Sequence, residues 1–490
     1  MKNRNNTGVK NAEVNSLFLY LLSAALWDRP ADGLRFKGLD GGVWKKIAVL
    51  AHKQSVSALV ADKVLSLPEE SLPPRELRMQ LLLQIEQTKT LNRNMVRVLG
   101  ALQQEYEQAG FPFVLMKGLA SGAQYPNPLL RNPGDIDVWL YRPGDYEKAR
   151  VWAAGQGYQA DDAGHIHYNY AWRGIVIEPH CRISYFDRKK YEKQFVAWEK
   201  EVAEQARFSR VPVAQLLREP SLQSPQQSQP QQSQEQGQPL QSQSQQGQPQ
   251  SQQQGQPQPQ QPQQSQSQQQ GQPQQEQPQQ SQSQPLQQEP QPLQQPQQPE
   301  IAVQVLPATL NAFFLFHHMF RHFVSLGVGF RQFCDWILFL QHYHGEIDRQ
   351  EFTERVRSYG LLYPMQVFAR VAVEYLDAPE EIFPFPLLPA GRHERRGRTG
   401  RHERTERRGR TERTERPERH TRRVAADILK NGNFGFHRPG KKRPPGKYSG
   451  MWFSFVLSVK RSLKFATLSV SHILIVPYKK LIHRFKIGFR

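Results

Sequence analysis

The spacing of hydrophobic residues along the chain predicts helices in the first hundred residues. Apolar side chains recur at intervals of three and four between Val14 and Leu22, and again between Val43 and Val60. A longer amphipathic pattern covers residues 75–108, where two prolines precede it and Gly110 ends it. Such intervals place apolar side chains on one face of an α-helix, so this region is expected to form a layer of packed helices.

The hydrophobic pattern changes to strand length after Gly110. Residues 111–116 and 136–141 are short apolar runs, and a helical pattern over residues 145–156 follows the second one. Residues 165–184 then alternate around Arg173 and Gly174, which predicts a β-hairpin. Helical periodicity returns over residues 306–376. This order predicts an α+β fold, in which a small mixed β-sheet is flanked by N-terminal helices and a C-terminal helical lobe.

Two low-complexity blocks interrupt this pattern. Residues 221–299 consist almost entirely of Gln, Pro, Ser and Gly, and residues 392–423 of Arg, Glu, Thr, Gly and His. Neither block has enough apolar surface to offset the entropy lost on ordering, so both are predicted to be disordered. The first is interpreted as a linker or as a repeat expansion in a surface loop. In the second, glycines and Pro417 favour disorder over a solvated helix.

These blocks set the expected domain boundaries. Outside them about 380 residues remain, enough for one domain of catalytic size with a helical companion. The expected segments are an N-terminal helical region (1–110), a mixed-sheet lobe (111–215), the Gln/Pro/Ser-rich insertion (221–299), a helical lobe (301–390), the Arg/Glu repeat (392–423) and a basic C-terminal tail (424–490).

The net charge of +20 is carried by two segments late in the chain. Residues 392–423 hold 14 Arg and 6 Glu, and residues 441–490 hold 12 Lys and Arg with no acidic residue. The tail mixes these cations with apolar residues, which is typical of a basic amphipathic helix on an anionic membrane surface, although a weakly ordered tail is the alternative. Nucleic acid is not the expected partner, because no recognition motif accompanies the basic residues.

Cysteine content and the apolar stretches indicate the compartment. Cys181 and Cys334 are the only cysteines, which excludes a disulfide-stapled secreted scaffold and, without clustered partners, a zinc site. The first fifteen residues lack the apolar core of a signal peptide, and charged residues break the stretch 451–476 before it is long enough to span a bilayer. A cytoplasmic protein is expected, peripheral to the inner face of the membrane if the tail binds lipid.

Three acidic residues in the strand-rich region point to metal chemistry. Asp135 and Asp137 are two positions apart, so on a strand both side chains point to the same face. Two such carboxylates repel unless a cation lies between them, and Mg²⁺ (or Mn²⁺) accepts oxygen ligands while leaving positions for phosphate oxygens. Glu178 follows an apolar strand and would complete a three-carboxylate cluster if the two strands are neighbours. These residues predict phosphoryl or nucleotidyl transfer.

The string Lys117-Gly118, the pair Asp135-Ile-Asp137 and a later acid resemble the nucleotidyltransferase (DNA polymerase beta-like) superfamily. With Tyr125-Pro126, Arg131-x-x-Gly134 and Glu178-Pro-His180, the chain is similar to the uncharacterised nucleotidyltransferase family within it, and further matching strings lie at residues 326–336 and 430–435. The resemblance implies that Asp135, Asp137 and Glu178 are catalytic metal ligands. It also implies that Gly118 lets a triphosphate approach the backbone.

Several neighbouring residues are candidates for nucleotide binding, namely Lys117, Gly118, Ser121 and Arg131. Lys117 either neutralises phosphate charge or is a surface lysine, and Arg131 either clamps phosphate or pairs structurally with Asp135. His180 lies two residues after Glu178 and is interpreted as an auxiliary residue that orients a ligand or carries a proton, with a structural histidine as the alternative.

Residues of the later helices are interpreted as structural. His317, His318 and His322 are assigned to packing on a Phe-rich helix, and Arg331 and Asp335 to an ion pair within one helix.

Together these features predict a metal-dependent nucleotidyltransferase that moves a nucleoside monophosphate from a nucleoside triphosphate such as ATP to a hydroxyl or phosphate acceptor. The acceptor can be a sugar, a polysaccharide precursor, a protein or a small molecule, and a role in surface-polysaccharide metabolism rests on family analogy alone. Two alternatives stay open. One is a catalytically inactive nucleotide-binding or regulatory protein, and the other is a basic adaptor on a membrane surface.

Overall fold

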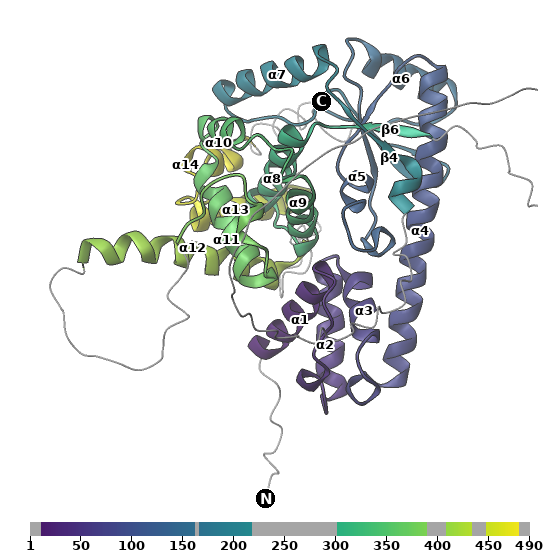
Figure 1. Ribbon diagram of the computed structural model, residues 1–490. Helices are drawn as coiled ribbons and strands as arrows, with labels where there is room; N and C mark the ends of the chain where they lie inside the picture. The colour runs from purple at the N-terminus through teal and green to yellow at the C-terminus, as the bar shows by residue number, and fades with distance from the viewer. Residues whose placement is uncertain (1–10, 162–165, 218–300, 390–407, 434–446, 480–490) are drawn as a thin grey trace, which may run out of the picture. The chain divides into compact units, whose positions relative to one another are not determined.

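The computed structural model describes residues 11–161, 166–217, 301–389, 408–433 and 447–479 (Figure 1). Contacts divide the chain into one unit formed by Met1–Ser221 with Gln298–Arg490 and a second formed by Leu222–Gln297. All described residues belong to the first unit. The disorder predicted for residues 221–299 and for residues 392–407 concerns segments outside the described residues.

Four helices begin the chain, as the hydrophobic spacing predicts. The fourth is the longest and follows Pro73 and Pro74, which cannot themselves donate helical hydrogen bonds. It ends at Gln108 and is capped by Ala109, and Gly110 then takes a left-handed conformation with φ of 82°. The helices, with two short 3₁₀ turns between them, are α1 (Asn11–Leu26), η1 (Gly33–Arg35), α2 (Gly41–Lys53), α3 (Ser57–Leu65), η2 (Glu69–Ser71) and α4 (Arg75–Gln108).

Six short strands form one mixed sheet in the order β3-β4-β2-β1-β6-β5. β2 runs parallel to β4 and antiparallel to β1, while β1 runs parallel to β6. The two outer pairs, β3 with β4 and β5 with β6, are antiparallel. The strands are β1 (Val114–Leu115), β2 (Ile136–Trp139), β3 (Tyr170–Trp172), β4 (Ile175–His180), β5 (Ser209–Pro212) and β6 (Ala302–Val305). The expected α+β class with a mixed sheet is confirmed.

The predicted β-hairpin is confirmed between β3 and β4. Trp172 pairs with Ile175, and the two residues between them, Arg173 and Gly174, have φ of 49° and 78°. Two consecutive left-handed residues make a type I′ turn, whose twist matches that of the strands on either side. This hairpin fixes the position of β4, the strand that carries Glu178.

The last two strands of the sheet differ from the expected boundaries. Sequence patterning assigns residues from 301 onward to a helical lobe, whereas residues Ala302–Val305 form β6 and join β1 in parallel. β5 pairs with β6, so Pro212 lies opposite Ala302 although the Gln/Pro/Ser-rich tract separates them in sequence. Strands of four residues give too short an alternation to distinguish them from a loop.

Helices also lie between and after the strands. Helix α8 begins after Pro307, and the three helices that follow it complete the expected helical lobe. The helices and 3₁₀ turns of this part are α5 (Leu119–Gly122), η3 (Pro128–Leu130), α6 (Asp145–Gly155), α7 (Lys189–Glu204), η4 (Val213–Leu217), α8 (Ala308–Ser325), α9 (Phe330–Tyr343), α10 (Arg349–Ser358), α11 (Leu362–Leu376), η5 (Glu380–Ile382), α12 (Arg408–Asn431), α13 (Lys447–Phe465) and α14 (Val470–Ile473).

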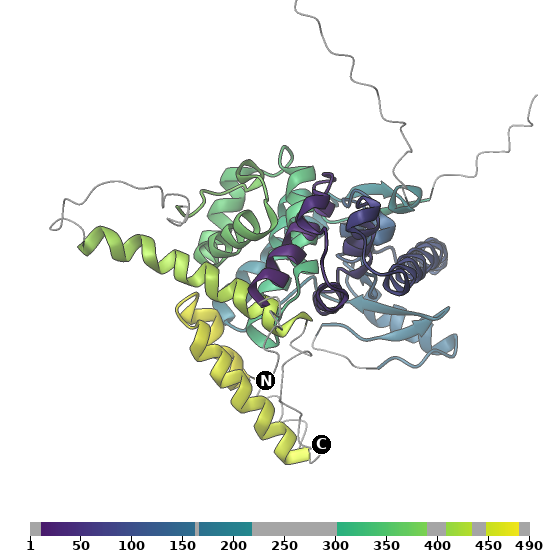
Figure 2. The ribbon, with the colours of Figure 1, turned by 90° about the horizontal axis from the view of Figure 1, so that it is seen from below.

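Helix α12 differs from the disorder expected for residues 392–423. It spans Arg408–Asn431 and continues through Pro417, and α13 follows it (Figure 2). The physical reason is tertiary packing, because Thr421, Val424 and Ile428 are buried on one face of α12, which contacts α11. Burial of an apolar face stabilises a helix whose sequence alone favours disorder.

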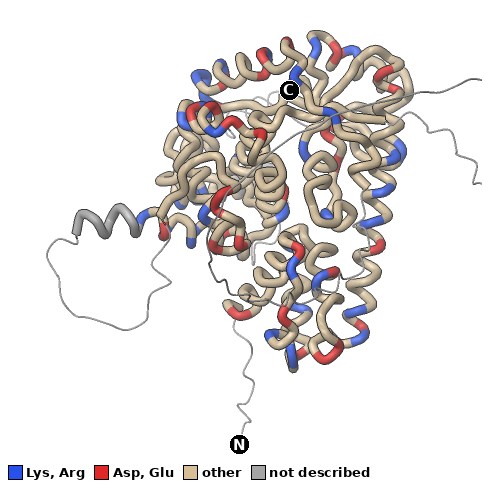
Figure 3. The backbone as a smooth tube through the Cα atoms, in the orientation of Figure 1, with Lys and Arg blue, Asp and Glu red and all other residues tan. Residues whose placement is uncertain are grey.

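Two hydrophobic cores support these layers. One lies around the sheet and includes Leu99 of α4 and Ala149 of α6. The other joins α1–α3 to the helical lobe through residues such as Phe18, Phe330 and Phe368. On α7, lysines alternate with glutamates instead of forming a patch of one sign (Figure 3). None of the helices in the described ranges combines the length and apolar content needed to cross a bilayer.

Candidate metal and nucleotide site

The register of two parallel strands brings three candidate ligands together. Asp137 of β2 lies directly opposite Glu178 of β4, and Trp139 lies opposite His180. Because positions two apart on a strand share a face, Asp137, Glu178 and His180 all point to the same side of the sheet. Each of the three residues has one atom that could bind a metal ion, and these three atoms lie within 4.8 Å of one another.

Asp137 is the centre of this cluster. Its side chain is 0% exposed, and its Oδ1 is 3.1 Å from His180 Nε2 and 2.8 Å from Lys117 Nζ. His180 Nε2 is also 3.7 Å from Glu178 Oε2. The second oxygen, Asp137 Oδ2, is buried and has no hydrogen-bond partner in the described part of the chain. A buried carboxylate oxygen left without a partner is costly, which marks this atom as a candidate ligand.

The turn after β1 carries Lys117 and Gly118 to the same edge of the sheet. Met116 N donates to Asp137 O at 3.0 Å, which ties this turn to β2. Gly118 has φ of 59° and ψ of −114°, and a Cβ added there would be 3.3 Å from Asp135 O. A side chain is strained in that conformation, so the site requires glycine. Asp135 precedes β2 and has no hydrogen-bond or ion-pair partner among the described residues.

Electrostatic interactions within the cluster favour the charged forms of Lys117 and Glu178. Burial lowers the pKa of Lys117, but the charges of Asp137, Asp135 and Glu178 outweigh it and raise the pKa above its ordinary value. Burial raises the pKa of Glu178, whereas hydrogen bonding to His180 lowers it, and the net pKa is below the ordinary value. Three carboxylates therefore share one ammonium and a histidine, which is an excess of negative charge.

The residues present fit a divalent cation. Two carboxylates and one imidazole converge, one carboxylate oxygen lacks a partner, and a third carboxylate, Asp135, faces the same cavity. Carboxylate oxygens are preferred by Mg²⁺ and Mn²⁺, and Mn²⁺ also accepts imidazole. The sequence predicts that Asp135, Asp137 and Glu178 form the metal-binding group. In the structure the three converging residues are Asp137, Glu178 and His180, and Asp135 lines the same cavity beside them.

The cluster opens into a cavity of about 820 Å³. The sheet side supplies the acidic cluster with Lys117 and Gly118, and α8 and α9 supply donors on the helical side. His318, Arg321 and His322 are spaced i, i+3 and i+4 on α8, so they share one face of the helix. A cavity of this volume is in the range of small-molecule sites.

Two of the three histidines on α8, His318 and His322, favour the neutral form. Burial, and then the positive charge of Lys117, lowers the pKa of His318 well below its ordinary value and that of His322 to about 3. Their rings lie 4.4 Å apart between centroids. Arg321 supplies the positive charge of this face, and its guanidinium lies 3.5 Å from the centroid of the Tyr185 ring.

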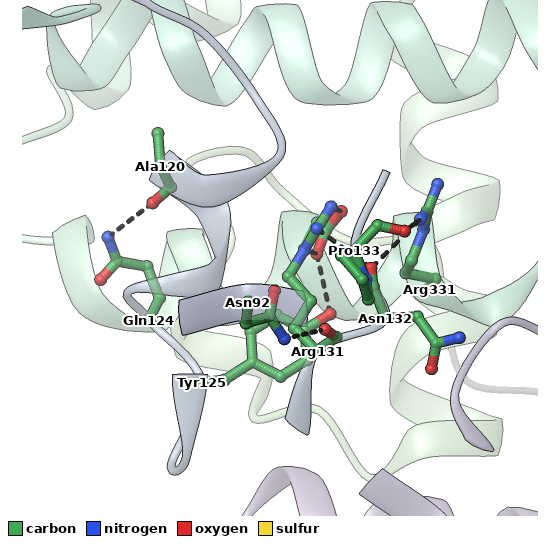
Figure 4. Close-up of polar contacts among 9 residues, drawn as sticks. Asn92, Ala120, Gln124, Tyr125, Arg131, Asn132, Pro133 and Arg331 are labelled. Carbon is green, nitrogen blue, oxygen red and sulfur yellow. Dashed lines mark hydrogen bonds and ion pairs between the residues drawn. The ribbon is translucent and has the colours of Figure 1, made fainter. Parts of the chain in front are cut away.

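Arg131 is held by a buried ion pair. Its Nε and Nη2 each donate at 2.8 Å to the two carboxylate oxygens of Asp335, and Tyr125 donates to the same carboxylate at 2.8 Å. Asn92 of α4 donates to Arg131 O at 2.8 Å (Figure 4). The loop before β2 is therefore bonded to α4 through the Arg131 backbone and to α9 through the Arg131 side chain. The partner of Arg131 is therefore Asp335, not the Asp135 considered from sequence.

Arg331 does not form the intrahelical pair expected with Asp335. Its Nη1 donates to the carbonyl oxygens of Asn132 and Pro133, at 3.2 and 3.4 Å (Figure 4). Its Nε is buried without a hydrogen-bond partner among the described residues. Arg331 lines the cavity and so presents an incompletely satisfied donor to it.

The structure places most sequence-derived candidates at one cavity. Asp135, Asp137, Glu178, Lys117, Gly118, Arg131 and His180 all line it, whereas Ser121 is buried in α5 and does not. The donor face of α8 was not predicted from the sequence, and neither was His167, whose ring stacks on His180 at 4.7 Å. The i, i+3, i+4 spacing of His318, Arg321 and His322 was the available signal, but the same spacing is typical of core packing.

Comparison with known families agrees with this geometry. A family model described as uncharacterised nucleotidyltransferase matches residues 40–220 and 274–377, more than half of the chain. The chain belongs to this nucleotidyltransferase family. The matched ranges contain the acidic cluster and the α8 and α9 residues that line the cavity. No curated protein and no solved structure matches the chain.

Proposed function

We propose that this nucleotidyltransferase moves a nucleoside monophosphate from a nucleoside triphosphate such as ATP to an acceptor hydroxyl or phosphate, with Mg²⁺ or Mn²⁺ as cofactor. The observation that carries the proposal is the register of β2 and β4, which sets Asp137 beside Glu178 in a cavity that also exposes donors from α8 and α9. Carboxylates suit a divalent cation, and the donors suit phosphate oxygens.

The acidic residues have distinct roles in this proposal. Asp137 and Glu178 hold the metal, and His180 orients Asp137 through the 3.1 Å contact. When bound there, a divalent ion neutralises phosphate charge and aligns the attacking and leaving oxygens. Asp135 is the carboxylate without a partner among the described residues, so it takes the proton of an acceptor hydroxyl.

The reaction forms one bond and breaks one. The acceptor oxygen bonds to the α-phosphorus while the bond from that phosphorus to the oxygen bridging to the β-phosphate breaks, and pyrophosphate leaves. Arg321 and Arg331 face the cavity and bind the departing phosphates. Arg131 is occupied by Asp335 and supports the loop below them. Lys117 contributes a further positive charge beside Gly118, where the missing side chain keeps the backbone accessible.

Nucleotide binding tests this function without knowledge of the acceptor. Replacing Asp137→Asn removes a metal-binding charge with little change in shape. Binding of the non-hydrolysable analogue α,β-methylene-ATP to the unaltered protein is expected to need Mg²⁺ or Mn²⁺. Because the variant lacks this charge, it is expected to bind the analogue at least tenfold more weakly, which corresponds to about 1.4 kcal/mol. Isothermal titration calorimetry with and without EDTA measures both effects.

Asp28→Asn is the matched control, since the Asp28 side chain is 80% exposed and lies outside the cavity lining. Thermal melts of both variants show whether the fold is retained. Binding that ignores both EDTA and the Asp137 substitution would contradict the proposal.

One contact favours the catalytically inactive alternative. Lys117 Nζ lies 2.8 Å from Asp137 Oδ1, so an ammonium already compensates the carboxylate that a metal would use. In a binding or regulatory protein of this kind, nucleotide binding is independent of metal and weakens when Lys117 is replaced by Met. The titrations with EDTA separate this alternative from the enzyme.

Membrane contact and a cytoplasmic location are also proposed. Near the C-terminus, Trp452 and Leu463 are 65% and 67% exposed, and Lys460 beside them is exposed. Arg461 and Lys464, in contrast, pair with Asp427 and are turned to the protein. Flotation with phosphatidylserine vesicles, compared with phosphatidylcholine vesicles, tests the membrane partner. A cytoplasmic reaction accords with nucleoside triphosphate as substrate and with the free thiols of Cys181 and Cys334.

A further inference from the structure

A second cavity of about 620 Å³ adjoins the first. Four residues line both cavities, namely Ile166, Tyr185, Arg321 and Ser325. Arg321, with its guanidinium over the Tyr185 ring, therefore stands at the border between the two spaces. A ligand that extends from the second cavity toward the acidic cluster of the first would pass this border.

The lining of the second cavity has more cations than acids. Arg182 pairs with Glu192 at 3.1 Å and also with the buried Glu199, so neither Arg182 nor Glu192 is available to a ligand. Arg188, Arg321 and Lys479 remain, against Asp187 alone, and none of these three cations forms an ion pair within the described part of the chain. Arg188 Nε donates to Ser471 O at 2.7 Å, which leaves its other nitrogens for a ligand.

The cations are distributed unevenly along the joined cavities. Arg188 and Lys479 line only the second cavity, and both are exposed to solvent, whereas Arg321 lines both cavities. Between them the wall includes stacked aromatic rings. Phe186 stacks on His317 at 4.1 Å and on Tyr359 at 5.0 Å, and Phe320 and Val324 complete this wall. A ligand that fits has an anionic group at the outer end and an uncharged body.

We infer that the second cavity binds the acceptor, and that this acceptor is a small molecule with a phosphate at one end and a hydroxyl at the other, as in a phosphorylated sugar or polyol. This inference rests on the proposed transfer function and narrows its substrate. The phosphate contacts Arg188 and Lys479, and the hydroxyl points past Arg321 to the acidic cluster. Its oxygen bonds to the α-phosphorus of the nucleotide, its proton passes to Asp135, and pyrophosphate leaves.

Retention of small molecules by the protein tests the inference directly. The full chain is saturated with Mg²⁺ and α,β-methylene-ATP, mixed with a small-molecule extract of cells, and washed by ultrafiltration. Mass spectrometry then identifies what is retained. The expected result is retention of phosphorylated compounds from the extract and of none from an extract treated with phosphatase.

Charge-neutral variants locate the binding site. The double variant R188Q/K479Q is expected to retain the same compounds about tenfold more weakly, since two partly exposed ion pairs are lost. The control K189Q/K190Q removes two exposed lysines outside the cavity lining and is expected to behave as the unaltered protein. With labelled nucleotide, the R188Q/K479Q change is expected to raise the KM for the retained compound and leave kcat within about twofold.

Each other outcome overturns the inference. Retention of nothing, equal retention from the phosphatase-treated extract, or equal retention by R188Q/K479Q and its control would show that the cavity is not an acceptor site for phosphorylated compounds. Metal-dependent binding of the nucleotide analogue is measured in the same samples. Its presence leaves the transfer function standing when the acceptor inference fails, and its absence indicates failure of the transfer function itself.

Discussion

Gly118 shows how one residue can be required by the backbone alone. Its φ of 59° with ψ of −114° lies in a region that side chains disfavour, and a Cβ would meet Asp135 O at 3.3 Å. Gly118→Ala is therefore expected to lower the free energy of unfolding by about 1 to 3 kcal/mol, through strain at the turn that carries Lys117. Urea unfolding followed by circular dichroism measures the change.

Gly155 supplies the matched control for this substitution. It is the last residue of α6, and an added Cβ would have no heavy atom within 4 Å. Gly155→Ala is expected to leave stability unchanged or to raise it by up to about 1 kcal/mol, because alanine loses less entropy on entering a helix. Equal destabilisation by both substitutions would remove the argument for a strained turn at Gly118.

His420 gives the fold a pH dependence. It is buried, and its ring nitrogens lie 2.8 Å from Tyr363 Oη and 2.8 Å from Thr467 Oγ1. Burial, followed by the charges of Arg416, Arg423 and Arg419, lowers the pKa of His420 from 6.5 to about 4. Between these values the unfolded chain binds a proton that the folded chain does not, so stability is expected to fall as pH decreases from about 6.5 to 4.

Thermal melts between pH 7 and pH 4 measure this effect. His420→Gln removes the titrating group, so the variant is expected to lose less of its melting temperature over that range than the unaltered chain. His344→Gln, at an exposed histidine, serves as control and is expected to retain the full loss. If the slopes for His420→Gln and the unaltered chain coincide, His420 does not control the pH dependence.

At the scale of elements, a buried ion pair docks α9 onto the loop before β2. Arg131 and Asp335 form two bonds of 2.8 Å, with side chains only 6% and 8% exposed. Asp335→Asn leaves the Arg131 charge without its partner, so a loss of about 3 to 5 kcal/mol in unfolding free energy is expected. Removing only the Tyr125 hydroxyl with Tyr125→Phe is expected to cost about 1 kcal/mol.

Glu204→Gln at the exposed pair with Lys200 is the control for charge removal, since both side chains are more than 60% exposed. It is expected to change stability by less than about 0.5 kcal/mol. Chemical denaturation of the three variants ranks these effects. A loss at Asp335 no larger than at Glu204 would show that the pair does not hold α9 in place.

Elements that depend on neighbouring residues were predictable, and those that depend on distant ones were not. The β3–β4 hairpin follows from Arg173 and Gly174, which carry the turn conformation locally. Pairing of β5 with β6 joins Pro212 to Ala302 across a long insertion, and no local pattern encodes that contact. Helix α12 likewise needs the surface of α11 to bury Val424 and Ile428.

The site divides in the same way. Strand alternation and apolar runs predict Asp137 and Glu178 as ligands of one metal site, but only the β2–β4 register sets them side by side. Arg131 had two readings from sequence, and its actual partner, Asp335, lies on a helix 204 residues later in the chain. Spacing within an element was therefore informative, whereas partner choice between elements required the tertiary structure.

At the scale of the whole molecule, the Gln/Pro/Ser-rich tract is expected to be dispensable for the fold. The strands on either side of it are neighbours, since Pro212 pairs with Ala302 and Val213 N donates to Ile301 O at 2.8 Å. The ends of the connection are therefore already close enough to be joined by a short loop.

Deleting Leu222–Gln297 shortens this connection about sevenfold. Each halving of the length of a flexible loop lowers the entropic cost of closing it by about 0.6 kcal/mol, so the free energy of unfolding is expected to rise by about 1.5 to 2 kcal/mol. Metal-dependent binding of α,β-methylene-ATP is expected to be unchanged, because the acidic cluster and the α8 donors lie outside the deleted segment. A control that replaces the same segment with a Gly/Ser linker of equal length separates loop length from sequence. Loss of stability in both proteins would show that the tract contributes contacts to the fold, and loss only in the deletion would show that the connection needs its length.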